Sequence, residues 1–285
     1  MPPAPATRRT IDRDLSLDGV GLFTGARASV RLRPGGDGVR FRRTDVPDAP
    51  ALHASVAFLG PGLGRNTCLG TAGTGVATIE HLMSALAVLG VTDVNVDCHG
   101  PELPIGDGSA SPWMDLLAGH GRDTGAPLEP IGLDGPIAVV DPRDDDATIV
   151  AEPAPAPSFE YALDYGPGSS IPRQRAAWSG SEVAYASDIA PARTFCTARE
   201  ARAMRAAGLF PHLTPSDMLV LDDSPEGGGR PIDNTLRFPD EPARHKLLDL
   251  IGDLWLLGRP LLARVVATRS GHALTHELCR RIGAG

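Results

Sequence analysis

Residues 241–257 read EPARHKLLDLIGDLWLL. Apolar residues recur there at helical spacing and Gly258 follows, so the pattern predicts one long helix. His245, Asp249 and Asp253 fall in one narrow stripe of that helix, at spacing i, i+4 and i+8. The apolar side chains fill a broad arc on the opposite side, namely Leu247, Leu248, Leu250, Ile251, Leu254 and Trp255. Exposed helices usually carry scattered, mixed charges, so a single His-Asp-Asp stripe is less common.

The His-Asp-Asp stripe has two interpretations. Imidazole nitrogen and carboxylate oxygen are both good ligands for Zn²⁺, and the i, i+4 spacing lets two side chains converge on one ion. A solvated face with a weak His–Asp pair explains the same spacing. The spacing alone does not decide between them.

Shorter elements of both kinds flank this helix in the sequence. The periodicity predicts helices at residues 78–89, with Thr78 as the cap, and at 111–118, 197–207 and 272–281. It predicts strands at 27–33 and 38–42, joined as a hairpin by the turn at 34–37, and at 91–98, 137–140, 148–151, 219–222 and 261–268. Regular βαβ units, GxGxxG and Walker motifs are absent, which favours an α+β fold over a Rossmann fold.

The domain organisation is predicted from length and composition. A chain of 285 residues suits two modest domains or one large one. Residues 119–130 are rich in glycine, proline and charge, which is typical of a domain boundary. We therefore predict an N-terminal domain at residues 1–122 and a C-terminal domain at 131–285.

The composition argues against several classes of protein. A net charge of −8, with only three tyrosines and three tryptophans, disfavours nucleic-acid binding. No run of 18 apolar residues occurs, and no apolar run follows the first residues, so we expect neither a membrane span nor a signal peptide. The four cysteines are far apart and form no CxxC pair. We expect them to be reduced thiols of a cytoplasmic protein.

A second candidate cluster is Glu80-His81, in the first turn of the helix predicted at 78–89. A catalytic zinc ion needs a third protein ligand, and a carboxylate that is not bound to the metal must take the proton of the attacking water. His81 and Glu80 could supply these two functions. Alternatively, Glu80 only favours the helix N-terminus and His81 has no special role. The HExxH motif of the common zinc proteases is absent.

Two further segments carry candidate catalytic groups. His272 follows Ser-Gly at the end of a predicted strand, where side chains are accessible. A carboxylate such as Asp253 could hold it protonated, so that it donates a proton to a leaving amine. A histidine without a role at a helix start explains the same pattern. Thr194 could hydrogen-bond a developing oxyanion, but this signal is weak by itself.

Seven segments together resemble UDP-3-O-acyl-N-acetylglucosamine deacetylases, the zinc enzymes of lipid A synthesis in Gram-negative bacteria. They occur in the family's order and span nearly the whole chain. They are GVGLFTG (19–25), TIEHLMSAL (78–86), GPELPIGDGS (100–109), ARTF (192–195), RFPDE (237–241), RHKLLDLIGD (244–253) and SGHAL (270–274).

The resemblance implies a fold and a reaction. The fold would be two similar α+β domains, each with helices layered on a β-sheet, and the active site would lie between them. An insert in the second domain, at about residues 195–220, would form an apolar passage for the acyl chain. The chain would act as a cytoplasmic monomer on UDP-3-O-acyl-N-acetylglucosamine and release acetate and UDP-3-O-acyl-glucosamine.

The resemblance also implies residue roles. One Zn²⁺ per chain would be held by His81, His245 and Asp249. Proton transfer and charge stabilisation would fall to the base Glu80, the acid His272, its orienting carboxylate Asp253, and Thr194 at the oxyanion. Substrate contacts would come from Lys246 and Arg269 at the diphosphate, Phe195 at the sugar and Leu213 in the acyl passage.

Several positions depart from the family's pattern. Phe23 stands where a histidine is usual, Arg269 replaces a lysine and Thr268 replaces a common aromatic residue. Residues 210–217 read FPHLTPSD where the family has Gly-Gly-Ser followed by Asn. Because His212 and Leu213 would fill space that glycines leave open, we expect a narrowed or rerouted passage and a changed acyl-length preference. The acidic stretch at 141–146 would be unfavourable beside a diphosphate unless it points away.

Two alternatives remain from the sequence. The chain could deacetylate a different nucleotide sugar or acylated amino sugar, which activity on the UDP-linked substrate would decide. It could also be a non-catalytic homologue that binds metal or ligand, although every proposed ligand and acid or base is present. Zinc bound without turnover would favour this second alternative.

Overall fold

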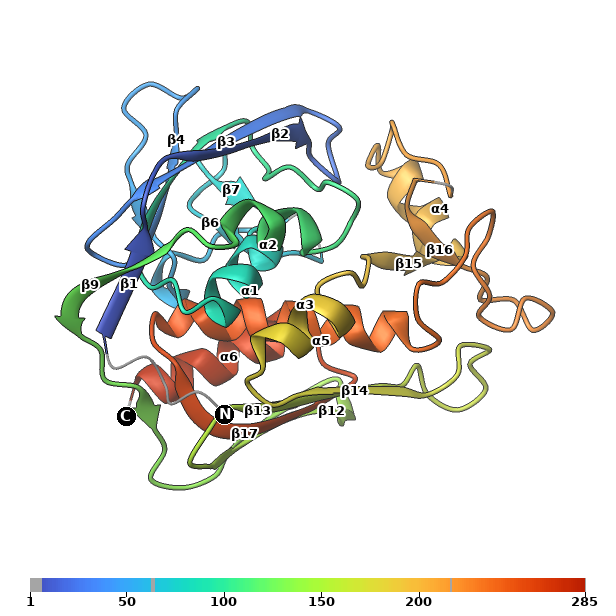
Figure 1. Cartoon of the computed structure of the whole chain (residues 1–285). Coiled ribbons are helices and arrows are strands. Elements are labelled where there is room, and N and C mark those ends of the chain that lie inside the picture. The colour runs from blue at the N-terminus through green and yellow to red at the C-terminus, as the bar shows by residue number, and fades with distance from the viewer. Residues whose placement is uncertain (1–6, 63–64, 216, 285) are drawn as a thin grey trace.

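A computed structural model of the chain places two β-sheets on either side of a layer of helices (Figure 1). It describes residues 7–62, 65–215 and 217–284. Helix α1 (Glu80–Val88) packs against α5 (Glu241–Leu254), which in turn packs on strands of the C-terminal sheet. Both sheets and these helices contribute to one hydrophobic core. The predicted α+β class is confirmed.

The N-terminal sheet has five strands in the order β2-β3-β8-β4-β5. Their bounds are Leu15–Val20, Arg27–Pro34, Val94–His99, Val39–Arg43 and Leu52–His53. Along β3, Ala28, Val30 and Leu32 are buried while their neighbours face outward. This alternation turns one face of the sheet toward the helices.

The hairpin predicted between residues 27 and 42 is wrong. Strand β8 lies between β3 and β4, antiparallel to the first and parallel to the second. The connecting segment crosses the start of β8, where the Gly38 N–H donates to the Asp93 carboxylate at 2.7 Å. A Cβ atom on Gly35 would lie 2.7 Å from the Val94 nitrogen, so this crossing requires a residue without a side chain.

The C-terminal sheet has five strands in the order β11-β12-β17-β13-β14, and β10 pairs with β17 beside them. The bounds in that order are Ile137–Asp141, Asp144–Pro153, Leu261–Thr268, Ser158–Leu163 and Gln174–Trp178, with β10 at Ile131–Gly132. Central strand β17 ends one turn before His272. The sheet thereby sets the position of the segment at 269–272.

Six α-helices are described: α1 (Glu80–Val88), α2 (Ser111–Leu117), α3 (Glu182–Asp188), α4 (Ala198–Ala206), α5 (Glu241–Leu254) and α6 (His272–Gly283). The short 3₁₀ helices are Val56–Phe58 and Trp255–Leu257. All predicted helices are confirmed within a few residues, and α3 was not predicted. Gly258 ends the long helix with a φ of 72°. Thr78 is not the cap of α1, since it has a φ of 59° and its hydroxyl donates to Glu102.

Three small sheets complete the fold. They pair β1 (Thr7–Ile11) with β9 (Gly121–Pro127), β6 (Cys68–Leu69) with β7 (Val76–Ala77), and β15 (Phe195–Thr197) with β16 (Leu219–Leu221). Helix α4 connects β15 to the parallel β16, and this unit projects to one side of the molecule (Figure 1). Strand β9 occupies most of the predicted domain boundary, and the division into two domains stays a prediction.

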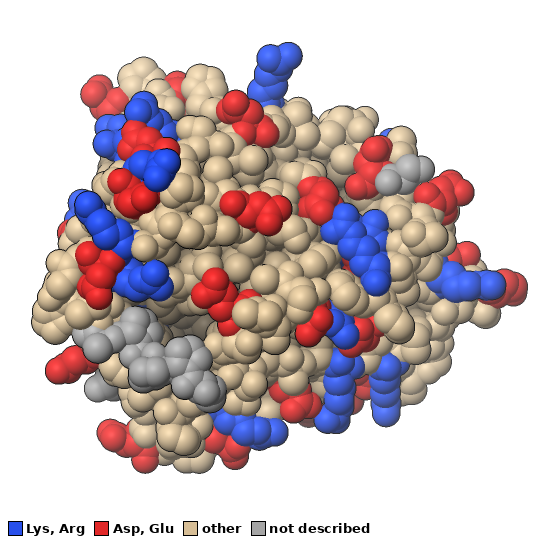
Figure 2. All heavy atoms as spheres, in the orientation of Figure 1, with Lys and Arg blue, Asp and Glu red and all other residues tan. Residues whose placement is uncertain are grey.

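On the face shown in Figure 2, acidic and basic side chains of the described residues are interspersed rather than gathered into one basic surface. Nucleic-acid binding generally needs such a basic surface. Within the described ranges, no helix combines the length and the apolar character needed to cross a bilayer.

Candidate active site

The His-Asp-Asp stripe of α5 is buried. His245, Asp249 and Asp253 are 3%, 6% and 1% exposed. Helix α1 covers α5 on one side and strands β13 and β14 cover it on another, so the helix has no broad solvated face. The interpretation as an exposed helix face is therefore wrong. Three buried polar side chains in a row need partners, and the rest of the site supplies them.

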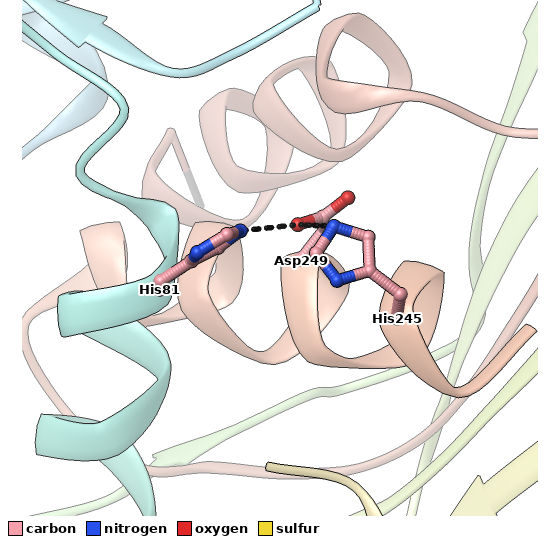
Figure 3. A group of neighbouring side chains, drawn as sticks. All are labelled: His81, His245 and Asp249. Atoms are coloured by element: carbon pink, nitrogen blue, oxygen red, sulfur yellow. Dashed lines mark ion pairs between the residues drawn. The ribbon is translucent and has the colours of Figure 1, made fainter. Parts of the chain in front are cut away.

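Helix α1 brings a third ligand candidate to this stripe. The Nε2 atoms of His81 and His245 lie 3.7 and 3.4 Å from the same oxygen, Oδ1 of Asp249 (Figure 3). The candidate ligand atoms of the three residues all lie within 4.8 Å of one another. Two ligands at tetrahedral zinc, each about 2 Å from the ion, are roughly 3.3 Å apart. The three side chains therefore fit a single small cation.

Gly252 explains how α1 comes close enough. A Cβ atom at this position would lie 2.1 Å from the carbonyl oxygen of Glu80, which is far inside contact distance. The bare backbone of α5 therefore lets the first turn of α1 rest against it. Any larger residue would push Glu80 and His81 away from Asp249.

Both histidines are poised as neutral ligands. Burial lowers the pKa of His81 to about 3 and also lowers the pKa of His245. His245 Nδ1 lies 3.1 Å from the carbonyl oxygen of Ala192, which can only accept a hydrogen bond. The Nδ1 proton is therefore held there, and the Nε2 lone pair is left for a metal.

Asp249 is charged despite its burial. Burial alone would raise its pKa, but Lys246 and the neighbouring histidines outweigh this effect and lower it. The Lys246 ammonium donates to Asp249 Oδ2 at 2.7 Å, which leaves Oδ1 facing the two imidazoles. The donor set is thus two neutral imidazoles and one carboxylate, a set typical of catalytic zinc.

Glu80 lies beside these three side chains. Its carboxylate, Asp249 and His272 form a second group of neighbouring ligand atoms within 4.8 Å. It is 3% exposed, and burial raises its pKa to about 8. The Thr67 N–H donates to its Oε2 at 3.1 Å. A buried carboxylate with a raised pKa is well suited to take up a proton.

His272 and Asp253 form a tight pair. His272 Nδ1 donates to Asp253 Oδ2 at 2.7 Å, and the His272 Nε2 atom lies 4.0 Å from Asp249. Burial opposes the charged imidazole, but the Asp253 carboxylate outweighs it and raises the pKa of His272 to about 9. The ring is therefore an imidazolium at neutral pH, and it can donate from Nε2.

A pocket of about 350 Å³ opens onto these groups. The structure brings ten of the eleven predicted site residues to it or directly beside it: Glu80, His81, Thr194, Phe195, His245, Lys246, Asp249, Arg269 and His272 line it, and Asp253 holds His272. Phe195 stands edge-on to the His245 ring, with centroids 6.3 Å apart. Thr194 is partly exposed rather than buried, and it faces the pocket.

Three aspartate carboxylates surround the Arg269 guanidinium. Its guanidinium contacts Asp146 at 2.8 Å, Asp164 at 3.0 Å and Asp144 at 3.7 Å. Two of these belong to the acidic stretch at 141–146, which therefore does not point away from the site. Asp141 and Arg143 of the same stretch line the pocket.

Leu213, the eleventh residue, lies in a separate apolar pocket. This pocket of about 190 Å³ is formed by α4, β16 and the segment that follows α4. Phe210 and Met218 line both pockets and stand between them. Phe210 stacks on Phe23 with ring centroids 5.2 Å apart, and its N–H donates to the Phe23 carbonyl at 2.9 Å. Phe23 and Phe210 therefore meet where the two pockets adjoin, and the narrowing expected from His212 and Leu213 stays a prediction.

Sequence reasoning missed two polar residues that contact the catalytic groups, Thr67 and His276. Thr67 contacts Glu80 and Asp253, and His276 lies 3.6 Å from Asp253. His276 stands four residues after His272 on α6, a spacing that marks a shared helix face and could have drawn attention to it. No local pattern distinguishes Thr67.

Known proteins resemble this chain over almost its full length. The family model described as UDP-3-O-acyl N-acetylglycosamine deacetylase matches residues 8–284. A UDP-3-O-acyl-N-acetylglucosamine deacetylase of Synechocystis is 37% identical over 278 residues, which covers 96% of this chain and 97% of that protein. Proteins of the same name from Myxococcus xanthus and Chlamydia muridarum are each 36% identical, covering 99% and 96% of this chain and 88% and 94% of their own lengths. On these matches, the chain belongs to the UDP-3-O-acyl N-acetylglycosamine deacetylase family.

Proposed function

We propose that this protein hydrolyses the N-acetyl group of UDP-3-O-acyl-N-acetylglucosamine, a step of lipid A biosynthesis, with one zinc ion per chain. Acetate and UDP-3-O-acyl-glucosamine would be the products, and the protein would work as a cytoplasmic monomer. The observation that carries this proposal is the convergence of His81, His245 and Asp249, with the carboxylate of Glu80 beside them and outside this set of three. The names of the relatives support the substrate.

The donor set fits zinc in charge and geometry. Two neutral imidazoles and one carboxylate leave room for substrate or water in a fourth position. In this position a zinc ion would polarise the acetamide carbonyl and lower the pKa of a water molecule. His81, His245 and Asp249 would hold the ion, and Lys246 would keep Oδ1 of Asp249 directed toward it.

Two proton transfers fall to two different residues of the pocket, Glu80 on α1 and His272 on α6. Glu80 would take the proton of the attacking water, and a nearby cation would bring its raised pKa down toward neutrality. His272 would stabilise the charge that develops in the transition state and then protonate the leaving amine, which otherwise leaves poorly. Thr194 would donate a hydrogen bond to the developing oxyanion.

The substrate contacts follow from the lining of the pocket. Phe195 would pack against the sugar ring, and Lys246 and Arg269 would meet the diphosphate. Both cations already contact carboxylates, so diphosphate binding would need the side chains around Arg269 to rearrange. We also propose that residues 1–122 and 131–285 act as two domains, the first supplying Glu80 and His81 and the second the other groups.

An acetate-release assay tests the proposed function. The zinc-loaded protein is expected to release one acetate for each UDP-3-O-acyl-N-acetylglucosamine consumed, with one zinc ion per chain by elemental analysis. Stoichiometric zinc without any acetate release would indicate a non-catalytic homologue. Faster release from another acetylated amino sugar would assign the enzyme to a different substrate.

The acyl-chain preference is expected to be set by the contact between Phe23 and Phe210. Burial of one methylene group contributes about 0.8 kcal/mol, so kcat/KM should rise roughly fourfold per added methylene as long as the chain fits. In the wild type this rise should stop where the chain meets the Phe23–Phe210 pair. In Phe210→Ala the two pockets should join, and the rise should continue to longer chains. Leu213 lines the second pocket and would contact these longer chains.

A matched control is Phe58→Ala, because Phe58 is 40% exposed and lies outside both pockets. It should reproduce the wild-type profile over a series of substrates with progressively longer acyl chains. If Phe210→Ala has the same optimum as the wild type, the Phe23–Phe210 pair does not limit the acyl chain.

A further inference from the structure

Thr67 contacts both proton-transfer systems of the site. Its backbone N–H donates to Glu80 Oε2 at 3.1 Å, and its hydroxyl lies 2.5 Å from Asp253 Oδ1. The same hydroxyl is 3.0 Å from His276 Nε2 and 3.3 Å from His272 Nδ1. Thr67 is 1% exposed and does not line the pocket. One buried residue therefore touches groups from α1, α5 and α6.

The hydrogen bonds of this residue have a fixed direction. A hydroxyl has one hydrogen, and the charged carboxylate of Asp253 can only accept it. The Thr67 oxygen is then left to accept, so His276 must present its Nε2–H to it. The resulting chain runs from His276 through Thr67 to Asp253 Oδ1, while Asp253 Oδ2 accepts from His272. Both oxygens of Asp253 are thereby held.

The geometry points to Thr67 as a positioning residue that fixes Glu80 and Asp253 relative to each other, with His276 as its support. This inference rests on the proposed hydrolase function. Glu80 and the Asp253–His272 pair belong to different helices, and the substrate must meet both in one turnover. A small displacement of either group would slow the reaction, because proton transfer requires hydrogen-bond distances. Thr67 holds Glu80 and Asp253 at a fixed separation. It does so from the side away from the pocket, where it contacts no substrate.

The test compares Thr67→Val with Thr67→Ser. Valine keeps the shape and the backbone N–H but loses the hydroxyl, whereas serine keeps the hydroxyl. Residues that orient a catalytic group typically contribute about 10- to 100-fold to activity. We expect kcat for acetate release to fall by this factor in Thr67→Val, with KM unchanged, and to recover mostly in Thr67→Ser. Zinc content should stay at the wild-type level in both.

Thr92→Val is the matched control for the loss of a buried hydroxyl. Thr92 is also 1% exposed and donates to an aspartate, Asp93, at 2.7 Å, but neither residue lines the pocket. The melting temperature of Thr92→Val is expected to fall as in Thr67→Val, while the kcat of Thr92→Val stays at the wild-type value. An equal loss of kcat in this control would show that the effect is one of general stability.

His276→Leu provides a second measurement should Thr67→Val fail to fold. It removes the donor to Thr67 from a side chain that is 12% exposed, and a loss of kcat within about tenfold is expected for one neutral hydrogen bond. A wild-type kcat in His276→Leu and in any folded Thr67→Val, or equal losses in Thr67→Val and Thr67→Ser, would overturn the role of the hydroxyl. A wild type that releases no acetate would instead contradict the proposed function.

Discussion

Glu80→Gln is expected to lower kcat/KM for acetate release by roughly 10²- to 10⁴-fold, the usual contribution of a general base. Glutamine keeps the shape of the side chain and its hydrogen bond from Thr67, but it cannot take up a proton. Glu80 is not one of the three ligand candidates, so the variant should still bind one zinc ion per chain. Activity and metal content, measured on the same sample, separate the loss of a base from the loss of the metal.

The same variant has an expected effect on stability. Burial raises the pKa of Glu80 from its ordinary value of 4.5 to about 8 in the metal-free folded chain. The folded state then binds a proton that the unfolded state has lost, so this group's contribution to stability falls as pH rises from 4.5 to 8. Glu80→Gln should remove this pH dependence, which thermal unfolding of the metal-free protein across that range would measure.

Glu277→Gln serves as the control, because its side chain is 40% exposed on α6 and lies outside the pocket. It should retain both the activity and the pH dependence of the wild type. Residual activity of Glu80→Gln within tenfold of the wild type would mean that another group accepts the proton.

The long helix α5 could be predicted nearly to the residue, whereas its surroundings could not. Its apolar periodicity and Gly258 depend only on neighbours in sequence. Burial of His245, Asp249 and Asp253 depends on α1, which is distant in the sequence. Even the nearest pair of site residues on the two helices, His81 and His245, is 164 residues apart. Periodicity shows that the stripe lies opposite the apolar arc but not what covers it.

The wrong hairpin and the unpredicted contacts of Arg269 both result from long-range strand pairing. Residues 27–42 carry a good hairpin pattern, yet a strand more than 50 residues later separates its two arms. The role of Arg269 at a diphosphate stays a prediction, but its carboxylate contacts could not be predicted from the sequence around it. Its carboxylate partners come from strand β12 and the end of β13, which the sheet brings together beside β17. The residues next to Arg269 in the sequence do not predict these contacts.

His81→Ala is expected to remove both the bound zinc and the catalytic activity. His81 is the ligand that α1 contributes to the proposed set of three, and without it this set is reduced to one imidazole and one carboxylate from α5. Two protein ligands are too few for a catalytic zinc site, which ordinarily has three. Zinc content should fall from one ion per chain to nearly none after dialysis, and acetate release should fall to background. Chelation of the wild type should have the same result, reversed by added zinc.

The burial of His81 also predicts how zinc binding depends on pH. Because burial lowers its pKa to about 3, the imidazole stays neutral and available to a metal far below neutral pH. The wild type should therefore keep one zinc ion per chain at pH 6 as well as at pH 8, whereas His81→Ala should lack zinc at both pH values. His53→Ala, whose side chain is 40% exposed on the N-terminal sheet, should keep its zinc and its activity. Retention of stoichiometric zinc by His81→Ala would place the metal elsewhere, and the assignment of Glu80 as the base beside it would fail with it.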